Sequence, residues 1–281
     1  GKMPTNDDLG RRMKEYYEQI PQIKLMRRTP VIIRIDGRAF HSFTKNFVRP
    51  FDDVLIKSMQ DTMKYLCENI QGCVLGYHQS DEISLVLVDY QRLNSSAWFD
   101  YEVQKICSIA ASMATMIFNK RFEENTYEYD VHLPKSVEKE VRDRILKYHC
   151  KAIDKGAQFD ARCFNIPKEE VANYFYWRQL DASRNSVQMV GQAQFTHKEL
   201  QNKSCNQIRD MLMIQKNINW NDFPIYQKRG SCCIKEEYQS ENVDNKDGAV
   251  VRNHWIIDKE IPIFKGEDRE YIDKLIFIGE G

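Results

Sequence analysis

Apolar side chains recur along this chain with two spacings, which predict strands and helices in a definite order. Apolar runs rich in β-branched residues predict four buried strands, over residues 31–36, 73–77, 83–88 and 159–166. Apolar positions with a 3.6-residue period predict amphipathic helices over 51–69 and 98–118. The resulting order, β-α-β-β-α-β, is typical of the split βαβ, ferredoxin-like plan. We therefore expect an α+β fold: a ferredoxin-like βαββαβ palm with additional C-terminal helices.

The segments outside this order have weaker patterns. Apolar residues at roughly helical spacing within 6–28 predict a leading helix. Residues 121–157 are charged and irregular, which indicates an insertion with a short helix. Further on, we expect a basic helix near 198–216, a polar mobile loop over 236–248 and a strand-like run over 271–278. The expected division is a helical lead (1–30), a catalytic palm (31–190) and a C-terminal helical, RNA-contacting region with the tail (191–281).

Acidic residues stand at the edges of two predicted strands. Asp36 ends the first strand, and Asp81-Glu82 lies in the turn that leads into the third. Taken alone, each is more typical of an ordinary turn. In the ferredoxin-like plan, however, the first and third strands are antiparallel neighbours, so both positions should meet at one edge of the sheet. Close carboxylates repel unless a cation is present, and magnesium needs only one or two of them beside phosphates and water. The pattern indicates phosphoryl or nucleotidyl transfer.

The composition indicates in which environment the protein works and how it can bind RNA. The 281 residues carry a formal net charge of zero, so any RNA-binding surface must be a local patch. The eight cysteines form no Cys-x-x-Cys pair and no cluster at zinc spacing, which predicts a reducing, cytoplasmic environment. An uninterrupted apolar run of about 18 residues is absent, so we expect a soluble protein with no membrane partner.

Phosphate binding must depend on side chains, because the sequence contains neither Gly-x-x-x-x-Gly-Lys nor Gly-x-Gly-x-x-Gly. Arg38, Arg49 and Lys105 are the candidates, and His41 lies near enough to Asp36 to contact a base or a phosphate. Lys105 is equally typical of a solvated lysine on a helix. The basic residues of 198–229 are likewise more typical of a solvated face than of an RNA site.

These candidate residues lie in or near four sequence motifs that occur in a fixed order along the chain. They are Arg-Ile-Asp-Gly-Arg-x-Phe-His at 34–41, Gly-Tyr-His-Gln-Ser-Asp-Glu-Ile-Ser at 76–84, Phe-Asp-Ala-Arg at 159–162 and Trp-Arg-Gln-Leu-Asp at 177–181. With them the chain resembles the tRNA(His) guanylyltransferase family, although the second motif has one extra residue and Tyr226 to Gly230 matches only loosely. The resemblance does not cover the tail after about residue 235.

The resemblance implies an enzyme that adds nucleotides to the 5′ end of tRNA in the 3′–5′ direction. ATP would activate a 5′-monophosphate, and the 3′-hydroxyl of GTP or another nucleoside triphosphate would attack the activated end. It also implies two magnesium ions held by Asp36, Asp81 and the Gly37 carbonyl, with Glu82 supporting the catalytic site, and a homotetramer. The implied nucleotide-binding residues are Asp36, Gly37, Arg38, Ala39, Phe40, His41, Arg49, Ser80, Asp81 and Lys105.

One departure from the family pattern bears on substrate choice. Where eukaryotic members have Cys-His-Ile-Asn-Asn after the fourth motif, this chain has Ala-Ser-Arg-Asn-Ser at 182–186, so Ser183 replaces the histidine. This resembles the guanylyltransferase-like branch, which repairs shortened tRNA 5′ ends against a template. Two alternatives remain open: a palm-fold nucleotide cyclase or signalling-nucleotide synthase, which needs no RNA, and a non-catalytic RNA-binding module.

Overall fold

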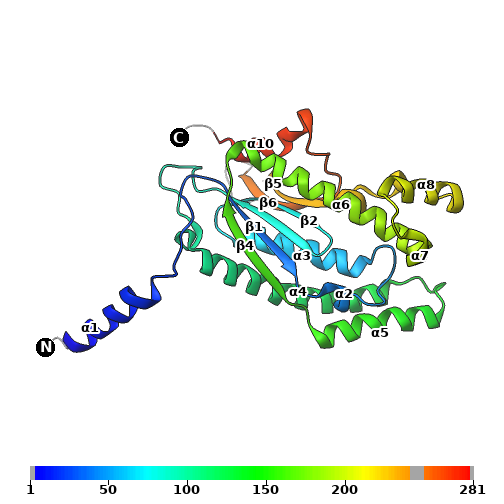
Figure 1. The fold of residues 1–281 in the computed structure, drawn as a ribbon, viewed down its shortest axis with the longest axis horizontal. Coiled ribbons are helices and arrows are strands. Elements are labelled where there is room, and N and C mark those ends of the chain that lie inside the picture. Colours follow the sequence, from blue (N-terminus) through cyan, green and yellow to red (C-terminus); the bar gives the residue numbers. More distant parts are fainter. Residues whose placement is uncertain (1–3, 241–249, 279–281) are drawn as a thin grey trace.

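One six-stranded antiparallel sheet forms the centre of the computed structural model, which describes residues 4–240 and 250–278 (Figure 1). Its strands are β1 (Val31–Gly37), β2 (Cys73–Gln79), β3 (Glu82–Leu87), β4 (Phe159–Asn165), β5 (Ser231–Ser240) and β6 (Val250–Asp258). They lie in the order β4-β1-β3-β2-β5-β6. The first four strands have the ferredoxin-like order, and β1 and β3 are antiparallel central neighbours. The predicted fold class is confirmed.

Helices cover both faces of this sheet (Figure 1). They are α1 (Pro4–Met13), α2 (Phe40–Phe43), α3 (Asp53–Asn69), α4 (Val103–His132), α5 (Lys139–Lys155), α6 (Val171–Gln194), α7 (His197–Leu200), α8 (Cys205–Lys216), α9 (Ile225–Arg229) and α10 (Glu270–Ile276). Short helical turns lie at Lys14–Glu18, Trp98–Tyr101, Lys168–Glu170, Trp220–Asp222 and Gly266–Arg269. Within the described ranges, no helix is long and apolar enough to span a membrane.

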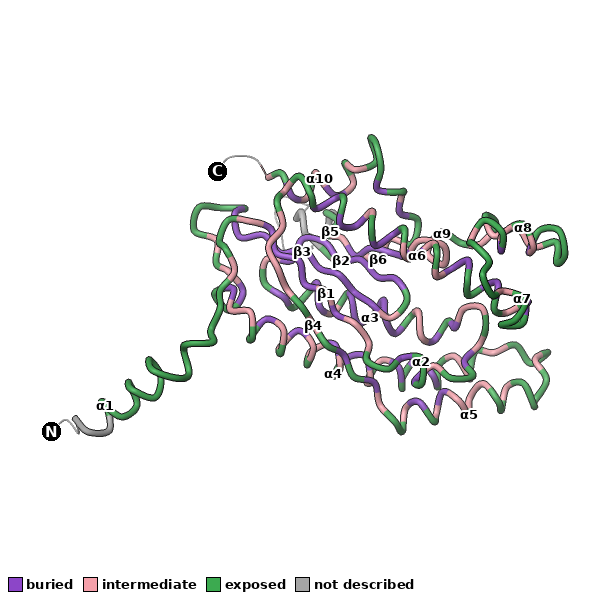
Figure 2. The backbone as a smooth tube through the Cα atoms, in the orientation of Figure 1, coloured by how far each residue is buried: buried purple, intermediate pink, exposed green. Residues whose placement is uncertain are grey.

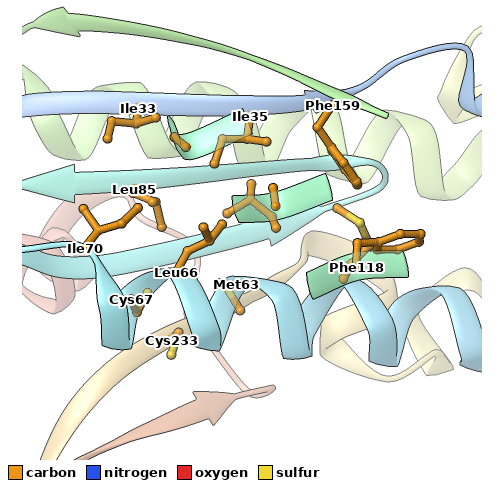
Figure 3. Close-up of a cluster of buried hydrophobic side chains, with 14 of the residues drawn as sticks. Ile33, Ile35, Met63, Leu66, Cys67, Ile70, Leu85, Phe118, Phe159 and Cys233 are labelled. Atoms are coloured by element: carbon orange, nitrogen blue, oxygen red, sulfur yellow. The ribbon is translucent and has the colours of Figure 1, made fainter. Parts of the chain in front are cut away.

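Alternation along β1 assigns each residue to one of two cores. Ile33 and Ile35 pack with Leu66 of α3 and Phe118 of α4, in the cluster drawn in Figure 3. Ile32, on the other face of the same strand, packs with residues of α6 and α10. Because successive side chains of a strand point to opposite faces, Arg34 and Asp36 lie on the Ile32 side of the sheet, which α6 covers. This alternation decides which helix contributes to the functional site.

Several predictions for the outer segments are wrong. Residues 121–157 are not irregular, because α4 continues to His132 and α5 follows with one buried face that includes Ala152. Residues 271–278 do not form a strand: Ile272 and Ile276, four residues apart, are both fully buried on one face of α10. The predicted helix over 198–216 is divided, because a capping box at Ser204 begins α8 separately from α7.

The predicted loop over 236–248 is also wrong where it can be compared. Residues 236–240 belong to β5, which pairs with β6 in a register from Cys232–Asp258 to Ser240–Val250. The remainder of that loop, residues 241–248, lies outside the described residues. Charged and apolar residues alternate only weakly in β5, so the sequence pattern did not reveal the β5–β6 hairpin. Since β5 pairs with β2, residues beyond 230 extend the palm sheet, while the predicted division at 30 and 190 stays a prediction.

The N-terminal segment stands apart from the body. Helix α1 projects away from the sheet, and its described residues are exposed along their length (Figure 2). The predicted leading helix is thus confirmed only to Met13 and the following turn at Lys14–Glu18, after which turns and one isolated bridge at Lys24 lead to β1. Apolar side chains on this arm, including Tyr17 and Ile20, are more than half exposed.

Asp52 connects the loop at Val48, helix α3 and helix α5, and it should be important for stability. Its buried carboxylate accepts hydrogen bonds from the backbone N–H groups of Leu55 (3.0 Å) and Val48 (3.1 Å), and His149 Nε2 lies 2.9 Å away. We expect Asp52→Ala to lower the free energy of unfolding by about 2–4 kcal/mol, because it removes a helix cap and leaves buried donors unpaired. Urea unfolding would measure this. The exposed neighbour Asp53 provides the control, and Asp53→Ala should cost less than about 1 kcal/mol.

Candidate functional site

The two predicted acidic strand ends meet at one edge of the sheet. Asp36 lies opposite Glu82 in the β1–β3 register, and the Gly37 N–H donates a hydrogen bond of 2.9 Å to the Asp81 carbonyl. Ser80, with φ of 49°, turns the chain between β2 and β3 and presents Asp81 toward the end of β1. The predicted convergence of Asp36 and Asp81 is therefore confirmed, and their chemical roles stay predictions.

This edge concentrates negative charge. Burial raises the pKa of the Asp81 carboxyl, and the charges of Asp36 and Asp160 raise it further. The sheet register brings Asp160 to this edge, because it lies opposite Asp36 on β4, the other neighbour of β1. Asp160 was not predicted as a site residue, although the motif at 159–162 contains it. A cation at this edge would relieve the repulsion between these carboxylates.

Two arginines partly balance Asp36 within the protein. Arg34 Nε lies 3.3 Å and Arg162 Nη2 3.5 Å from the same carboxylate oxygen of Asp36. Among the described residues, no group of three or more His, Cys, Asp or Glu side chains is arranged to hold a metal ion. Two carboxylates and a backbone carbonyl nevertheless fit magnesium, which takes few protein ligands when phosphates complete its shell.

Glu82 is held by side chains of β2 and α6. Its buried carboxylate accepts hydrogen bonds from Arg178 Nε (2.9 Å) and Nη2 (2.7 Å), and from Gln79 Nε2 (2.6 Å). Burial raises the pKa of Glu82, and the guanidinium of Arg178 acts in the opposite direction. With both oxygens engaged, Glu82 is placed to support the site, as the resemblance implies, rather than to bind a metal.

Helix α6 supplies a polar network behind Glu82. Arg178 Nη2 also donates to Asp181 (2.8 Å), and Asp181 accepts further hydrogen bonds from Gln79 (3.2 Å) and from Arg184. The motif from Trp177 to Asp181 was visible in the sequence, but the role of Arg178 was not predicted. The spacing of Arg178 and Asp181, one helical turn apart, was the signal that both face the same partner.

The residues after β1 divide into exposed and buried members. Arg38, Ala39 and His41 are exposed near the Asp36 edge, where a ligand can reach them. Phe40, by contrast, is buried against Phe118 and Phe159, so its side chain belongs to the core. A Cβ on Gly37 would lie 2.4 Å from the Phe40 ring, which explains the glycine at this position. Of the predicted nucleotide-binding segment, the Phe40 ring is thus the part that a ligand reaches least.

Two neighbouring hollows are lined by residues of α3 and α6, and the smaller one reaches the Ser80 turn. One is a groove of about 540 Å³ that His41 and Arg49 line, and the other is a cavity of about 110 Å³ that Gln79 and Ser80 line. Both are also lined by Asp52, Leu55 and Met189, so they are neighbours. The Gln79 Oε1 atom accepts no hydrogen bond from the part of the chain that the structure describes. The predicted nucleotide-binding residues His41, Arg49 and Ser80 therefore border two neighbouring hollows.

Within one chain, the fold does not place Lys105 at the sheet edge that carries Asp36 and Asp81. It lies near the start of α4, with its Nζ 5.5 Å from the centroid of the Phe99 ring. Helix α4 reaches the Asp36 end of the sheet only at Thr115, whose hydroxyl accepts a hydrogen bond from the Phe159 N–H. Ten helical residues separate Lys105 from Thr115, about 15 Å along the axis. A role of Lys105 at the triphosphate stays a prediction that this chain alone does not support.

The fold and site together define a palm-type nucleotidyltransferase. The family model described as tRNAHis guanylyltransferase matches residues 10–167, more than half of the chain. The chain belongs to this family, whose members are nucleotidyltransferases.

Known relatives match the chain over most of its length. A solved structure titled "Bacterial tRNA(HIS) Guanylyltransferase (Thg1)-Like Protein in complex with ATP" is 43% identical, covers 96% of this chain and 100% of its own, and has a TM-score of 0.77. A structure of such a bacterial protein in complex with GTP is 40% identical, with the same coverage and a TM-score of 0.74. The "Probable tRNA(His) guanylyltransferase" of Dictyostelium discoideum is 28% identical over 78% of this chain and 80% of its own.

Proposed function

We propose that this protein adds nucleotides to the 5′ end of tRNA in the 3′–5′ direction, using Asp36 and Asp81. The observation that carries the proposal is the meeting of these two carboxylates at the ends of neighbouring palm strands, joined by the Gly37–Asp81 hydrogen bond. Family membership supports it, and so do the ATP and GTP complexes of the bacterial relatives.

The reaction consists of two displacements at phosphorus. In the first, an oxygen of the RNA 5′-monophosphate attacks the α-phosphorus of ATP, pyrophosphate leaves, and the RNA end becomes a 5′-adenylylated diphosphate. In the second, the 3′-hydroxyl of the incoming nucleoside triphosphate attacks the original RNA 5′ phosphorus, and AMP leaves. The product is one nucleotide longer and carries the new triphosphate at its 5′ end.

Magnesium fits the residues at this edge, because two close carboxylates with a raised pKa at Asp81 favour a bound cation. Asp36, Asp81 and the Gly37 carbonyl would hold the two ions that the resemblance implies. When bound, magnesium would stabilise the charge that develops on the phosphoryl oxygens. The protein itself contributes the fixed spacing of the carboxylates and the Arg178–Glu82 pair beneath them.

The two neighbouring hollows are suited to nucleoside triphosphates. The larger groove offers Arg49 and His41 for phosphate or base, and Arg38 lies exposed beside Asp36. ATP and GTP or other nucleoside triphosphates are the proposed substrates, with tRNA as the acceptor.

Residues 182–186 favour template-dependent repair over obligatory guanylate addition to tRNA(His). Ser183 replaces the family histidine, and Arg184 is engaged in an ion pair with Asp181. An ion-paired arginine and a short hydroxyl offer few free groups for reading one particular tRNA. We therefore propose that base pairing with the opposite strand selects the added nucleotide.

The cellular setting belongs to the same proposal. We propose the reducing cytoplasm from the cysteine pattern, which contains no Cys-x-x-Cys pair and no cluster at zinc spacing. A homotetramer is proposed from the resemblance, and exposed apolar residues of the N-terminal arm, such as Tyr17 and Ile20, offer surface for subunit contacts.

A single assay distinguishes the proposal from its alternatives. Truncated tRNAs of several identities would be incubated with ATP, magnesium and the four nucleoside triphosphates, and the products resolved by length. We expect RNA lengthened at its 5′ end, and no reaction with magnesium and nucleotides alone. A cyclic or linked nucleotide formed without RNA would instead indicate a nucleotide cyclase or signalling-nucleotide synthase, and RNA binding without extension would indicate a binding module.

A further inference from the structure

A large aromatic side chain remains exposed beside the carboxylate edge. Trp177 is 51% exposed on α6, and the guanidinium carbon of Arg34 lies 5.9 Å from its ring centroid. Arg34 also approaches Asp36, with Nε 3.3 Å from the carboxylate. A single guanidinium group therefore separates the exposed indole from the proposed reaction centre.

The Trp177 ring is held in place by its neighbours. The guanidinium carbon of Arg178 lies 4.3 Å from the ring centroid, and the ring of Tyr174 approaches at 5.8 Å with an interplanar angle of 67°. Arg178 is itself fixed by its two hydrogen bonds to Glu82. A ring that is already ordered loses little conformational entropy when a ligand stacks on it.

Two arginines lie on the same face of the sheet as this ring, and both also pair with the carboxylate of Asp36. Arg34 and Arg162 lie opposite one another in the β1–β4 register, and the Arg162 side chain is 54% exposed. Exposed aromatic rings next to arginines are the combination with which proteins bind unpaired nucleotides, because the ring stacks on a base and the cation meets the phosphate. The net charge of the chain is zero, so this local patch is not part of a general basic surface.

The surroundings of Trp177 favour an RNA end over a free nucleotide. Trp177 lines neither of the two hollows that border Ser80, His41 and Arg49. Those hollows are lined by residues of α3, α6 and the segment 41–49, whereas Trp177 is half exposed beside Arg34 of β1. A polymer end can reach the open surface while nucleoside triphosphates occupy the hollows.

We propose that Trp177 stacks on the base at the 5′ end of the RNA acceptor and that Arg162 contacts the adjoining phosphate. This inference rests on the proposed function and identifies the surface that delivers the 5′ end to Asp36 and Asp81. Arg178 acts through Trp177 and Glu82 as a positioning residue. The stacked base need not be of one kind, because every base has a π-face.

The test uses a duplex RNA with a recessed 5′ end that carries 2-aminopurine as its terminal base, and no nucleoside triphosphate. Stacking on the wild-type protein should quench the fluorescence of the terminal 2-aminopurine, and a probe placed at an internal position should change little. Trp177→Ala should abolish the quenching and weaken RNA binding about tenfold, whereas Trp177→Phe should retain much of both. Binding of ATP alone should be unchanged in both variants.

Two further variants sharpen the result. Tyr127, 49% exposed on α4 beneath the opposite face of the sheet, provides the control, and Tyr127→Ala should bind RNA normally. Arg162→Ala should reduce the slope of log affinity against log salt concentration by about 1, as expected for one lost phosphate contact.

Three results would overturn the inference: an unquenched terminal probe with the wild-type protein, RNA binding by Trp177→Ala within twofold of wild type, or a loss of ATP binding in that variant. Because these measurements involve no nucleotide addition, they are independent of the extension assay. Extension with normal RNA binding by Trp177→Ala would refute only the stacking surface. A wild-type protein that quenches the terminal probe but never extends RNA would refute only the proposed reaction.

Discussion

Asp81→Asn is expected to lower nucleotide addition by about a thousandfold or more, because an amide at this position removes one of the two charges that would hold a divalent cation. The substitution is nearly isosteric and removes a carboxylate whose pKa burial already raises, so the fold should persist. Single-turnover extension of a 5′-truncated tRNA measures the rate, and RNA binding measured separately should stay near wild type.

Asp160→Asn is the matched control for this prediction. Asp160 lies at the same sheet edge, opposite Asp36, but its side chain is 60% exposed and it is not among the proposed ligands. Its removal should change the rate by less than about tenfold. A large loss of rate in Asp160→Asn together with a small loss in Asp81→Asn would contradict the assignment of Asp81 as a metal ligand.

Arg178→Met is expected to destabilise the protein by about 3–5 kcal/mol, because it leaves the buried carboxylate of Glu82 without its cation. Without Arg178, the already raised pKa of Glu82 should rise further. The folded variant then binds this proton more tightly than the unfolded chain does. Its stability should therefore be greatest below the ordinary pKa of glutamate and should fall as pH rises through the folded-state pKa.

Urea unfolding of wild type and Arg178→Met at pH 5.5 and pH 7.5 tests the sign of this effect, and the difference between them should be larger at the higher pH. Adding Glu82→Gln should restore part of the loss, since it removes the uncompensated charge. Arg184→Met, which removes an exposed partner of Asp181 on the same helix, should cost less than about 1 kcal/mol. Equal losses at both pH values would contradict a buried, charge-dependent pair.

The central palm could be predicted because its signals are local and strong. The β-branched run before Asp36 and the helical period over 51–69 each fixed one element, and the ferredoxin-like plan then fixed which strands are neighbours. The β5–β6 hairpin was missed because β5 carries charged residues such as Lys235 and Glu236 where a buried strand would show apolar ones. Helix α10 was misread because a short apolar run is ambiguous in period, and only its packing through Ile272 and Ile276 decides.

The site shows the same division between local and tertiary signals. Asp36 and Asp81 were found because turn residues at strand ends are visible in the sequence. Asp160 and Arg162 enter through the β1–β4 register, and the partnership of Arg178 with Glu82 depends on how α6 lies across the sheet. Phe40 stands in a motif next to the exposed residues Arg38 and His41, and only its contacts with Phe118 and Phe159 show that its ring is in the core.

The most direct test of the proposed reaction is to vary the template. A set of tRNAs lacking the first 5′ nucleotide would differ only in the base opposite the missing position, and sequencing of the extended 5′ ends would identify the added nucleotide. Our account predicts that wild-type protein adds the complementary nucleotide in each case, regardless of tRNA identity, and that Asp81→Asn adds almost none. Addition of guanylate whatever the opposite base, or extension of tRNA(His) alone, would contradict it.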